Sequence, residues 1–180
     1  VGLNWGPSLP PVMIVPLMFI AGFIGGAFWG LIPAVLKLRF SINEVISTLM
    51  LNYICAEFLT LLIVGPWKSK KKFGFPYTDD LPDSAILSLL PGTRIHIVTL
   101  MLALFTVVLL TLVIYKTRFG YEVRVIGENP DAAKYAGIDF TRTTLLIMTI
   151  SGGMAGLAGV GEVAGIHHYL SYPDSISSGY

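Results

Sequence analysis

Four apolar runs, each long enough to cross a membrane, constrain this chain more than any other feature. They lie at about residues 11–36, 44–66, 95–115 and 144–166, and a helix needs roughly 20 apolar residues to cross about 30 Å of hydrocarbon. Backbone polar groups in lipid must be satisfied within the segment, which favours helices. We therefore expect an all-α, polytopic integral membrane protein, in which residues 1–180 form part of one transmembrane domain with a bundle of about four membrane-spanning helices.

Composition and charge agree with a membrane protein and narrow its partners. The chain is 54% hydrophobic and 13% charged, unlike a soluble domain of ordinary composition, so we expect membrane lipid around it. A net charge of +1 leaves no broad basic surface for nucleic acid. The single cysteine, Cys55, has no second cysteine to pair with and is interpreted as a packing residue. The chain does not begin with Met and stops in a loop at Tyr180, which suggests a fragment of a longer protein.

Small residues recur every fourth position in the first and fourth runs. This spacing puts them on one ridge of a helix, where another helix can approach closely. The sequence "GVGEVAG" in the fourth run faintly resembles a dinucleotide-binding loop, but its spacing is G-x-G-x-x-x-G and it lies inside an apolar run. We therefore predict helix packing for Gly22, Gly26, Gly30, Gly152, Gly156, Gly161 and Gly165.

The second run is the least lipid-like of the four. At 100° per residue, one face collects Glu44, Ser47, Thr48, Asn52 and Cys55, and the other side carries Tyr53, Glu57 and Thr60. Polar residues within a span usually face a bundle interior or a water-filled cavity. Two interpretations stay open, hydrogen bonding between helices and a substrate pathway.

A charged insert at 116–143 separates the third and fourth runs. Within "GENPDAAKYAGI", Asn129 is a good helix N-cap, Pro130 suits the first helical position, Asp131 favours the positive end of the helix dipole, and Gly137 suits a C-terminal stop. The pattern predicts a helix of about two turns over 130–136. A helix this short is marginal in water unless something packs on it. That surface is either the membrane face of its own protein or a separate soluble subunit, to which Ala132, Ala133 and Ala136 would offer a close approach.

The insert also carries a family resemblance. "RFGYEVRVIGENPDAAKYAGI" resembles the cytoplasmic coupling segment of ABC-transporter permeases in the branched-chain amino acid and simple-sugar importer family, with its G-x-N-P-x-A-A-x-x-x-G-I pattern. "LKLRFSINEVISTLMLNYI" and "GPWKSKKKFGFP", followed by "LPDSAILSLLPG", look like the nucleoside-importer branch. The resemblance extends from about Leu36 to His168.

Several expectations follow from this resemblance. The chain would be a permease subunit without catalytic residues in the cell (inner or plasma) membrane, translocating a nucleoside or simple sugar. Its partners would be an ABC ATPase subunit that holds ATP and Mg, a second permease subunit and an extracytoplasmic substrate-binding lipoprotein. The segment 116–143 would lie in the cytoplasm and the loop 67–94 outside. The numbers of Lys and Arg residues favour this orientation by a small margin, with seven on the side of 116–143 and five on the side of 67–94.

The resemblance implies the coupling residues, and the polar face of the second run indicates the substrate-pathway residues. The ATPase-coupling residues would be Gly127, Asn129, Pro130, Asp131, Ala132, Ala133, Gly137 and Ile138. For the substrate pathway we favour Asn52 and Thr48, then Asn43 and Glu44, because an amide both donates and accepts hydrogen bonds, as a nucleobase edge or a ribose hydroxyl requires. His167 and His168 near Glu162 are not expected to bind a metal, since adjacent histidines on a helix point about 100° apart. The alternative function is a secondary transporter or channel whose insert is a self-docked gate.

Overall fold

The computed structural model describes residues 11–67, 78 and 96–167, and within these ranges the chain is helical with no β-strand. The elements are α2 (Pro11–Phe40), α3 (Glu44–Val64), α4 (Ile97–Lys116), α5 (Arg118–Glu128), α6 (Pro130–Tyr135), α7 (Phe140–Glu162) and a π-helical turn, η3 (Val163–His167). Four helices are long and apolar enough to cross a membrane, over Met13–Phe40, Glu44–Val64, Ile97–Lys116 and Phe140–Gly165. The predicted all-α polytopic fold is confirmed.

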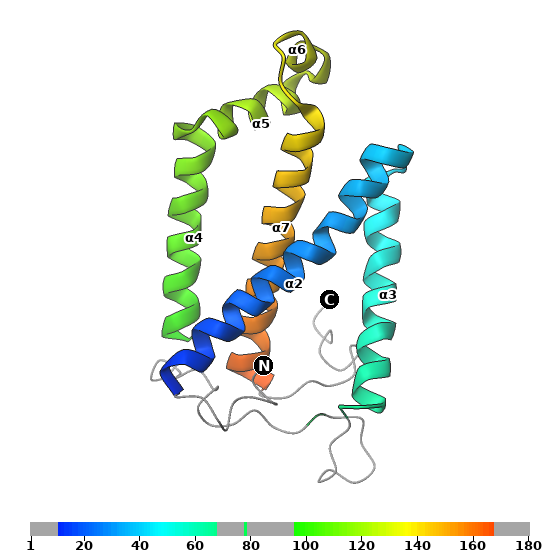
Figure 1. Cartoon of the computed structure of the whole chain (residues 1–180). Coiled ribbons are helices and arrows are strands. Elements are labelled where there is room, and N and C mark those ends of the chain that lie inside the picture. The colour runs from blue at the N-terminus through cyan, green and yellow to red at the C-terminus, as the bar shows by residue number, and fades with distance from the viewer. Residues whose placement is uncertain (1–10, 68–77, 79–95, 168–180) are drawn as a thin grey trace.

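Among the four spans, α2 and α7 cross in close contact, and α3 and α4 lie to either side of this crossing (Figure 1). Helices α3, α4 and α7 run roughly alongside one another, while α2 crosses α7 diagonally. Helix α5 lies across the ends of the spans between α4 and α6, and α6 projects beyond those ends. The helical segments of the insert are thus gathered at one end of the bundle.

Glycines bring α2 and α7 into backbone contact, the most extensive contact between two of the described helices. A Cβ built on Gly26 would meet the carbonyl oxygen of Gly152 and lie 2.9 Å from Cα of Gly156. On Gly30 it would lie 2.7 Å from the carbonyl oxygen of Met148, and on Gly22 3.0 Å from that of Gly156. Helices pack this closely in membranes only where side chains are absent. Pro16 and Pro33 lie inside α2 without ending it.

Two glycines near the end of the fourth span, Gly161 and Gly165, face a different partner. Thr99 and His96, at the start of α4, lie where Gly161 and Gly165 would carry side chains. Near this end Ile14, Phe19 and Ala164 form a small buried cluster that joins α2 to η3, and Leu102 of α4 packs against it. Helix α7 therefore contacts α2 along its middle and α4 at its C-terminal end.

The helix boundaries differ from the expected ranges at several places, and α2, for example, continues to Phe40 instead of ending at about 36. Helix α7 begins at Phe140 instead of about 144, because the Asp139 side chain caps it by accepting a hydrogen bond from the Arg142 backbone N–H (3.0 Å). Residues 118–128 form α5, which the sequence analysis did not predict as a helix. Its N-cap is Thr117, whose hydroxyl accepts from the Gly120 backbone N–H (3.2 Å). The loop expected at 67–94 lies almost wholly outside the described residues.

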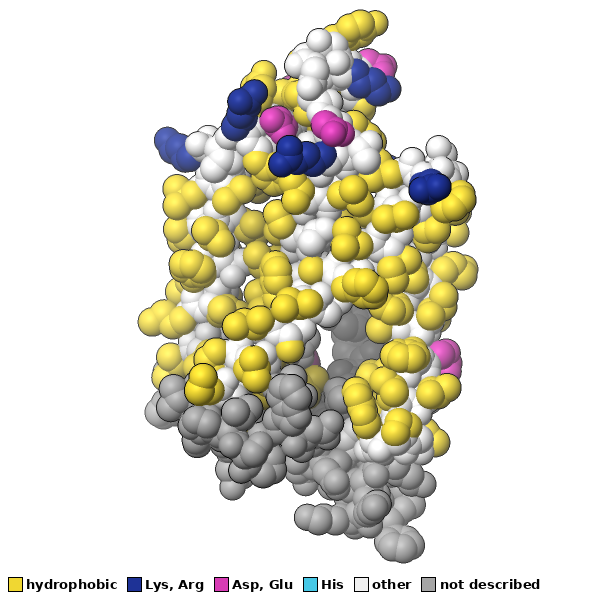
Figure 2. All heavy atoms as spheres, viewed as in Figure 1, with side chains coloured by type: hydrophobic (Ala, Val, Ile, Leu, Met, Phe, Trp, Pro, Cys, Tyr) yellow, Lys and Arg dark blue, Asp and Glu magenta, His cyan; other side chains and the backbone are white. Residues whose placement is uncertain are grey.

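The surface separates charge from apolar side chains (Figure 2). The described Lys and Arg side chains gather at the end that carries α5 and α6, and they are Lys37, Arg39, Lys116, Arg118, Arg124, Lys134 and Arg142. Large exposed apolar side chains cover α3 and α4, and no residue of α4 is buried. Surfaces this apolar require lipid or further helices around them.

Candidate functional site

Helix α6 is terminated at both ends by specific backbone and side-chain hydrogen bonds. The Asn129 side-chain oxygen accepts from the backbone N–H groups of Asp131 (3.0 Å) and Ala132 (3.1 Å), and Pro130 occupies the first turn. At the other end Gly137 has φ +73°, a left-handed conformation that favours glycine, and the Ile138 N–H donates to the Ala133 carbonyl (3.0 Å). The caps predicted from the sequence are present, and the helix spans Pro130–Tyr135.

The two faces of α6 have opposite environments. Ala133 is 0% exposed, whereas Tyr135 is 94% exposed. Ala132 is also exposed, and Asp131 and Lys134 form an ion pair at 3.4 Å on the solvent side. The sequence analysis offered Ala132, Ala133 and Ala136 together to a partner, but Ala133 packs on its own chain. Only the face that carries Tyr135 is free for another protein.

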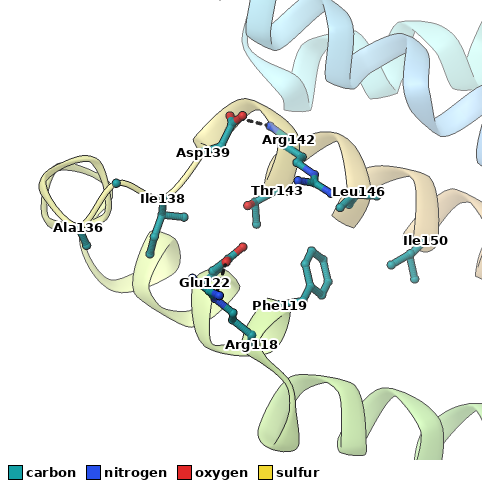
Figure 3. A pocket seen from close by; sticks show the side chains of 11 residues that line it. Arg118, Phe119, Glu122, Ala136, Ile138, Asp139, Arg142, Thr143, Leu146 and Ile150 are labelled. Atoms are coloured by element: carbon teal, nitrogen blue, oxygen red, sulfur yellow. Dashed lines mark hydrogen bonds and ion pairs between the residues drawn. The ribbon is translucent and has the colours of Figure 1, made fainter.

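A cleft of about 710 Å³ separates α5 from the start of α7 (Figure 3). Phe119 of α5 and Leu146 and Ile150 of α7 line its apolar side. Arg118 pairs with Glu122 at 3.8 Å, and Arg142 lies across from them on α7. Since the cleft leaves space between α5 and α7, these two helices are not held together along their length.

The corner between α4 and α5 is, by contrast, tightly packed. Gly120 is buried, and a Cβ at this position would meet the carbonyl oxygens of Val113 and Ile114. The Thr117 hydroxyl donates to the Val113 carbonyl, and the Arg124 guanidinium lies 5.4 Å from the centre of the Tyr115 ring. We infer that α4 and α5 move as one piece.

The predicted substrate-pathway residues lie on or next to α3, which is largely exposed along its length. Asn43 caps α3 by accepting from the Val45 N–H (2.9 Å), and Glu44 pairs with Lys37 of α2 at 2.8 Å. The Thr48 hydroxyl donates to the Glu44 carbonyl (2.8 Å). Asn52 is exposed, with no hydrogen-bond partner among the described residues. Asn43 and Glu44 thus have local structural roles, and Asn52 keeps its side chain free.

A buried polar contact between α4 and α7 was not found from the sequence. His96 is 4% exposed, and its Nε2 and the Thr99 Oγ1 are buried without a hydrogen-bond partner in the described part of the chain. Both residues pack on the glycines of α7 and η3, where the helix changes from α to π. A buried polar group left unpaired costs about 1–3 kcal/mol, and π-helical turns often occur at functional sites. His96 could have been noticed as a histidine at the rim of an otherwise uncharged span.

Comparison with known families gives one match over nearly the whole chain. Residues 3–179 match the family described as branched-chain amino acid transport system / permease component. No solved structure gives a significant match.

Individual relatives are similar at about one residue in three. The nucleoside ABC transporter permease protein NupB of Lactococcus lactis is 31% identical over 97% of this chain and 50% of its own length. The glucose ABC transporter permease protein TsgB13 of Haloferax volcanii is 36% identical over 88% of this chain and 44% of its own. The guanosine ABC transporter permease protein NupP of Bacillus subtilis is 31% identical over 90% of this chain and 47% of its own length. The chain therefore spans about half the length of these curated relatives.

Proposed function

This chain belongs to the branched-chain amino acid transport permease family, and from that membership we propose that it forms part of the membrane-spanning permease subunit of an ATP-driven ABC importer. It is a multi-pass membrane protein, with four helices long enough to cross a membrane. In this proposal it lies in the cell membrane, has no enzymatic role of its own, and acts together with the remaining helices of the full-length permease.

In the proposed orientation of the permease, α5 and α6 lie in the cytoplasm. The support is that seven of the twelve Lys and Arg residues lie at that end, since cytoplasmic ends of spans carry an excess of basic residues. The Lys-rich segment at 68–72 would then lie outside the cell, although its structure is outside the described residues.

The single observation that best supports ATP coupling is the two-sided exposure of α6. Its inner face is fixed to the permease through Ala133, and its outer face presents Tyr135 to solvent beyond the ends of the spans. A short helix that is capped at both ends and packed on one face can move as a rigid element when a partner protein binds its other face and changes position. We assign its outer face to the ATPase subunit, with ATP and Mg bound by that subunit and not by this chain.

The substrate in this proposal is a nucleoside or a simple sugar. The support is the similarity to permeases named for nucleosides, guanosine and glucose. Asn52 and then Thr48 are the proposed substrate contacts, and Asn43 and Glu44 contribute through their positions at the α2–α3 corner. Delivery would come from an extracytoplasmic binding lipoprotein, and a second permease subunit would complete the pathway.

Uptake in vesicles tests this proposal. The full-length permease is reconstituted with its ATPase and permease partners, so that the binding protein and ATP lie on opposite sides. We expect ATP-dependent uptake of a labelled nucleoside or glucose that branched-chain amino acids do not inhibit. Uptake of the same solutes without any effect of ATP would instead support a gradient-driven carrier, in which α6 is a self-docked gate.

A further inference from the structure

The described helices divide into two groups according to how they contact one another. The first group is α2 and α7, whose backbones touch through Gly22, Gly26, Gly152 and Gly156. The second is α4 and α5, joined by the packed corner at Gly120 and by the contact of Arg124 with Tyr115. Helix α6 follows α5 directly through Asn129, the C-cap of one helix and the N-cap of the next.

At the end of the bundle that carries α5, the two groups of helices are only partly packed against each other. The cleft lined by Phe119, Leu146 and Ile150 separates α5 from α7. The chain passes from α6 to α7 through Gly137, which has φ +73°. A Cβ added to Gly137 would have no atom within 4 Å, so the residue is not packed against its surroundings. Movement of α5 and α6 relative to α7 can therefore be accommodated in part by widening or narrowing this cleft.

At the opposite end the two groups meet through His96 and Thr99. These are the buried polar groups without described partners, and they face Gly165 and Gly161. Both atoms are already buried within this chain, on the side of α4 that meets Gly161 and Gly165. If α4 and α7 separated, the His96 imidazole and the Thr99 hydroxyl would gain access to water, and closing the contact removes these two polar side chains from water. A contact of this kind is poised between two states.

We propose that His96 and Thr99 of α4, closed against Gly165 and Gly161, form a gate at the end of the bundle distant from α6, and that α4 and α5 act as the lever that opens it. Helix α4 has 20 residues and is about 30 Å long, so a tilt imposed at its α5 end displaces its His96 end. The gate rests on the proposed function, because α6 receives the movement from the ATPase. In the open state it offers an imidazole and a hydroxyl as hydrogen-bonding groups, which suit a hydroxyl-bearing solute.

A disulfide across the gate tests this proposal. A Cβ on Gly161 would lie 4.0 Å from the Thr99 Cβ, within the range of about 3.5–4.5 Å for a disulfide. The pair Thr99→Cys and Gly161→Cys is placed in a full-length permease without other cysteines, with Cys55→Ser, and assembled with its partners. Oxidation should lower ATP-dependent uptake about tenfold or more, because a transporter held in one of two states cannot cycle, and a reductant should restore it.

The matched control is a disulfide within the first group. A Cβ on Gly22 would lie 3.5 Å from the Val160 Cβ, so Gly22→Cys with Val160→Cys links α2 to α7. Because Gly22→Cys itself crowds the Gly156 carbonyl oxygen (3.0 Å from the added Cβ), the reduced form of the same variant is the reference. Since α2 and α7 move together, oxidation should leave uptake at that reference level. Loss of uptake here as well would overturn the division into two groups.

Two results would overturn the gate itself. One is unchanged uptake after complete cross-linking of residues 99 and 161, and the other is failure of this pair to cross-link at all. The cysteine-free parent distinguishes a wrong gate from a wrong function. If the proposed function is wrong, the parent itself shows no ATP-dependent uptake; if only the gate is wrong, the parent still shows it. Thr99→Cys alone then reports on the gate without transport, because a maleimide should label it faster in the assembled complex when ATP binding changes the state.

Discussion

The carbonyl oxygen of Gly152 in α7 occupies the space into which Gly26 of α2 would project a side chain. The contact is therefore made by two backbones and not by interlocking side chains. It is also reciprocal, because a Cβ on Gly152 would meet the carbonyl oxygen of Gly26.

Gly26→Leu should separate α2 from α7 and destabilise the protein by at least about 1–3 kcal/mol, the usual effect of overpacking. Gly25→Leu is the matched control, since a Cβ on the neighbouring Gly25 has no atom within 4 Å. Thermal unfolding of the purified full-length permease measures the difference. Equal unfolding temperatures for the two variants would contradict the close approach at Gly26.

Ala133→Trp should destabilise the permease itself, because Ala133 has no exposed surface and the indole cannot fit between α6 and its own chain. Ala132→Trp, one residue earlier on the exposed side, should leave the stability of the isolated permease unchanged. The measurement is thermal unfolding in the absence of the ATPase. A stable Ala133→Trp variant that fails only to bind the ATPase would instead mean that this face is the docking surface.

Tyr135→Ala should weaken binding of the ATPase subunit by about 2 kcal/mol or more, which is typical when an aromatic anchor is lost from an interface. Stability should not change, because the side chain is 94% exposed. Tyr53→Ala, an exposed tyrosine of α3, serves as the control. Co-purification of the ATPase in normal amounts with Tyr135→Ala would rule out the proposed anchor.

Asn129→Ala should remove the cap shared by two backbone N–H groups and destabilise α6 by about 0.5–2 kcal/mol. Asn129→Asp retains an accepting oxygen and should restore most of this loss. Hydrogen exchange at the amides of Asp131 and Ala132 follows the effect directly. Unchanged protection in Asn129→Ala would show that the packing of Ala133 alone holds the helix.

Asn52→Ala should raise the KM for uptake, with less effect on the amount of assembled complex, because the Asn52 side chain is exposed and has no partner among the described residues. Thr60→Val is the control, since Thr60 lies about two turns further along α3 and its hydroxyl already donates to the Ala56 carbonyl (2.9 Å). If both the KM and the maximal rate of Asn52→Ala equal those of the parent, Asn52 does not contact the substrate.

The spans and α6 could be predicted because their signals are local. Twenty apolar residues, or Asn129 followed by Pro130 and Asp131, act within one segment and need no knowledge of the rest of the fold. Helix α5 was missed although its apolar residues Phe119, Val123 and Ile126 have the i, i+4, i+7 spacing of an amphipathic helix. This local signal was overlooked because the segment was interpreted only as part of the charged insert.

The pairing of faces could not be predicted either. The sequence indicates that Gly26 and Gly161 are both packing residues, but not that the first meets α7 and the second meets α4. The same limit applies to Ala133, whose burial depends on the direction in which α6 leaves α5. His96 gave no signal beyond its position at the edge of a span, because its burial comes from residues far away in the sequence.

The contact of Gly26 with Gly152 also bears on how the protein is made. Gly152 follows Gly26 by 126 residues, which takes about 6–25 s to synthesise at about 5–20 residues per second. During that time α2 is already long enough to enter the bilayer, yet the helix that covers its glycine face does not exist. The main tertiary contact of the described fold can thus form only after α7 has been synthesised, and until then the glycine face of α2 must contact another surface, in lipid or in the insertion machinery.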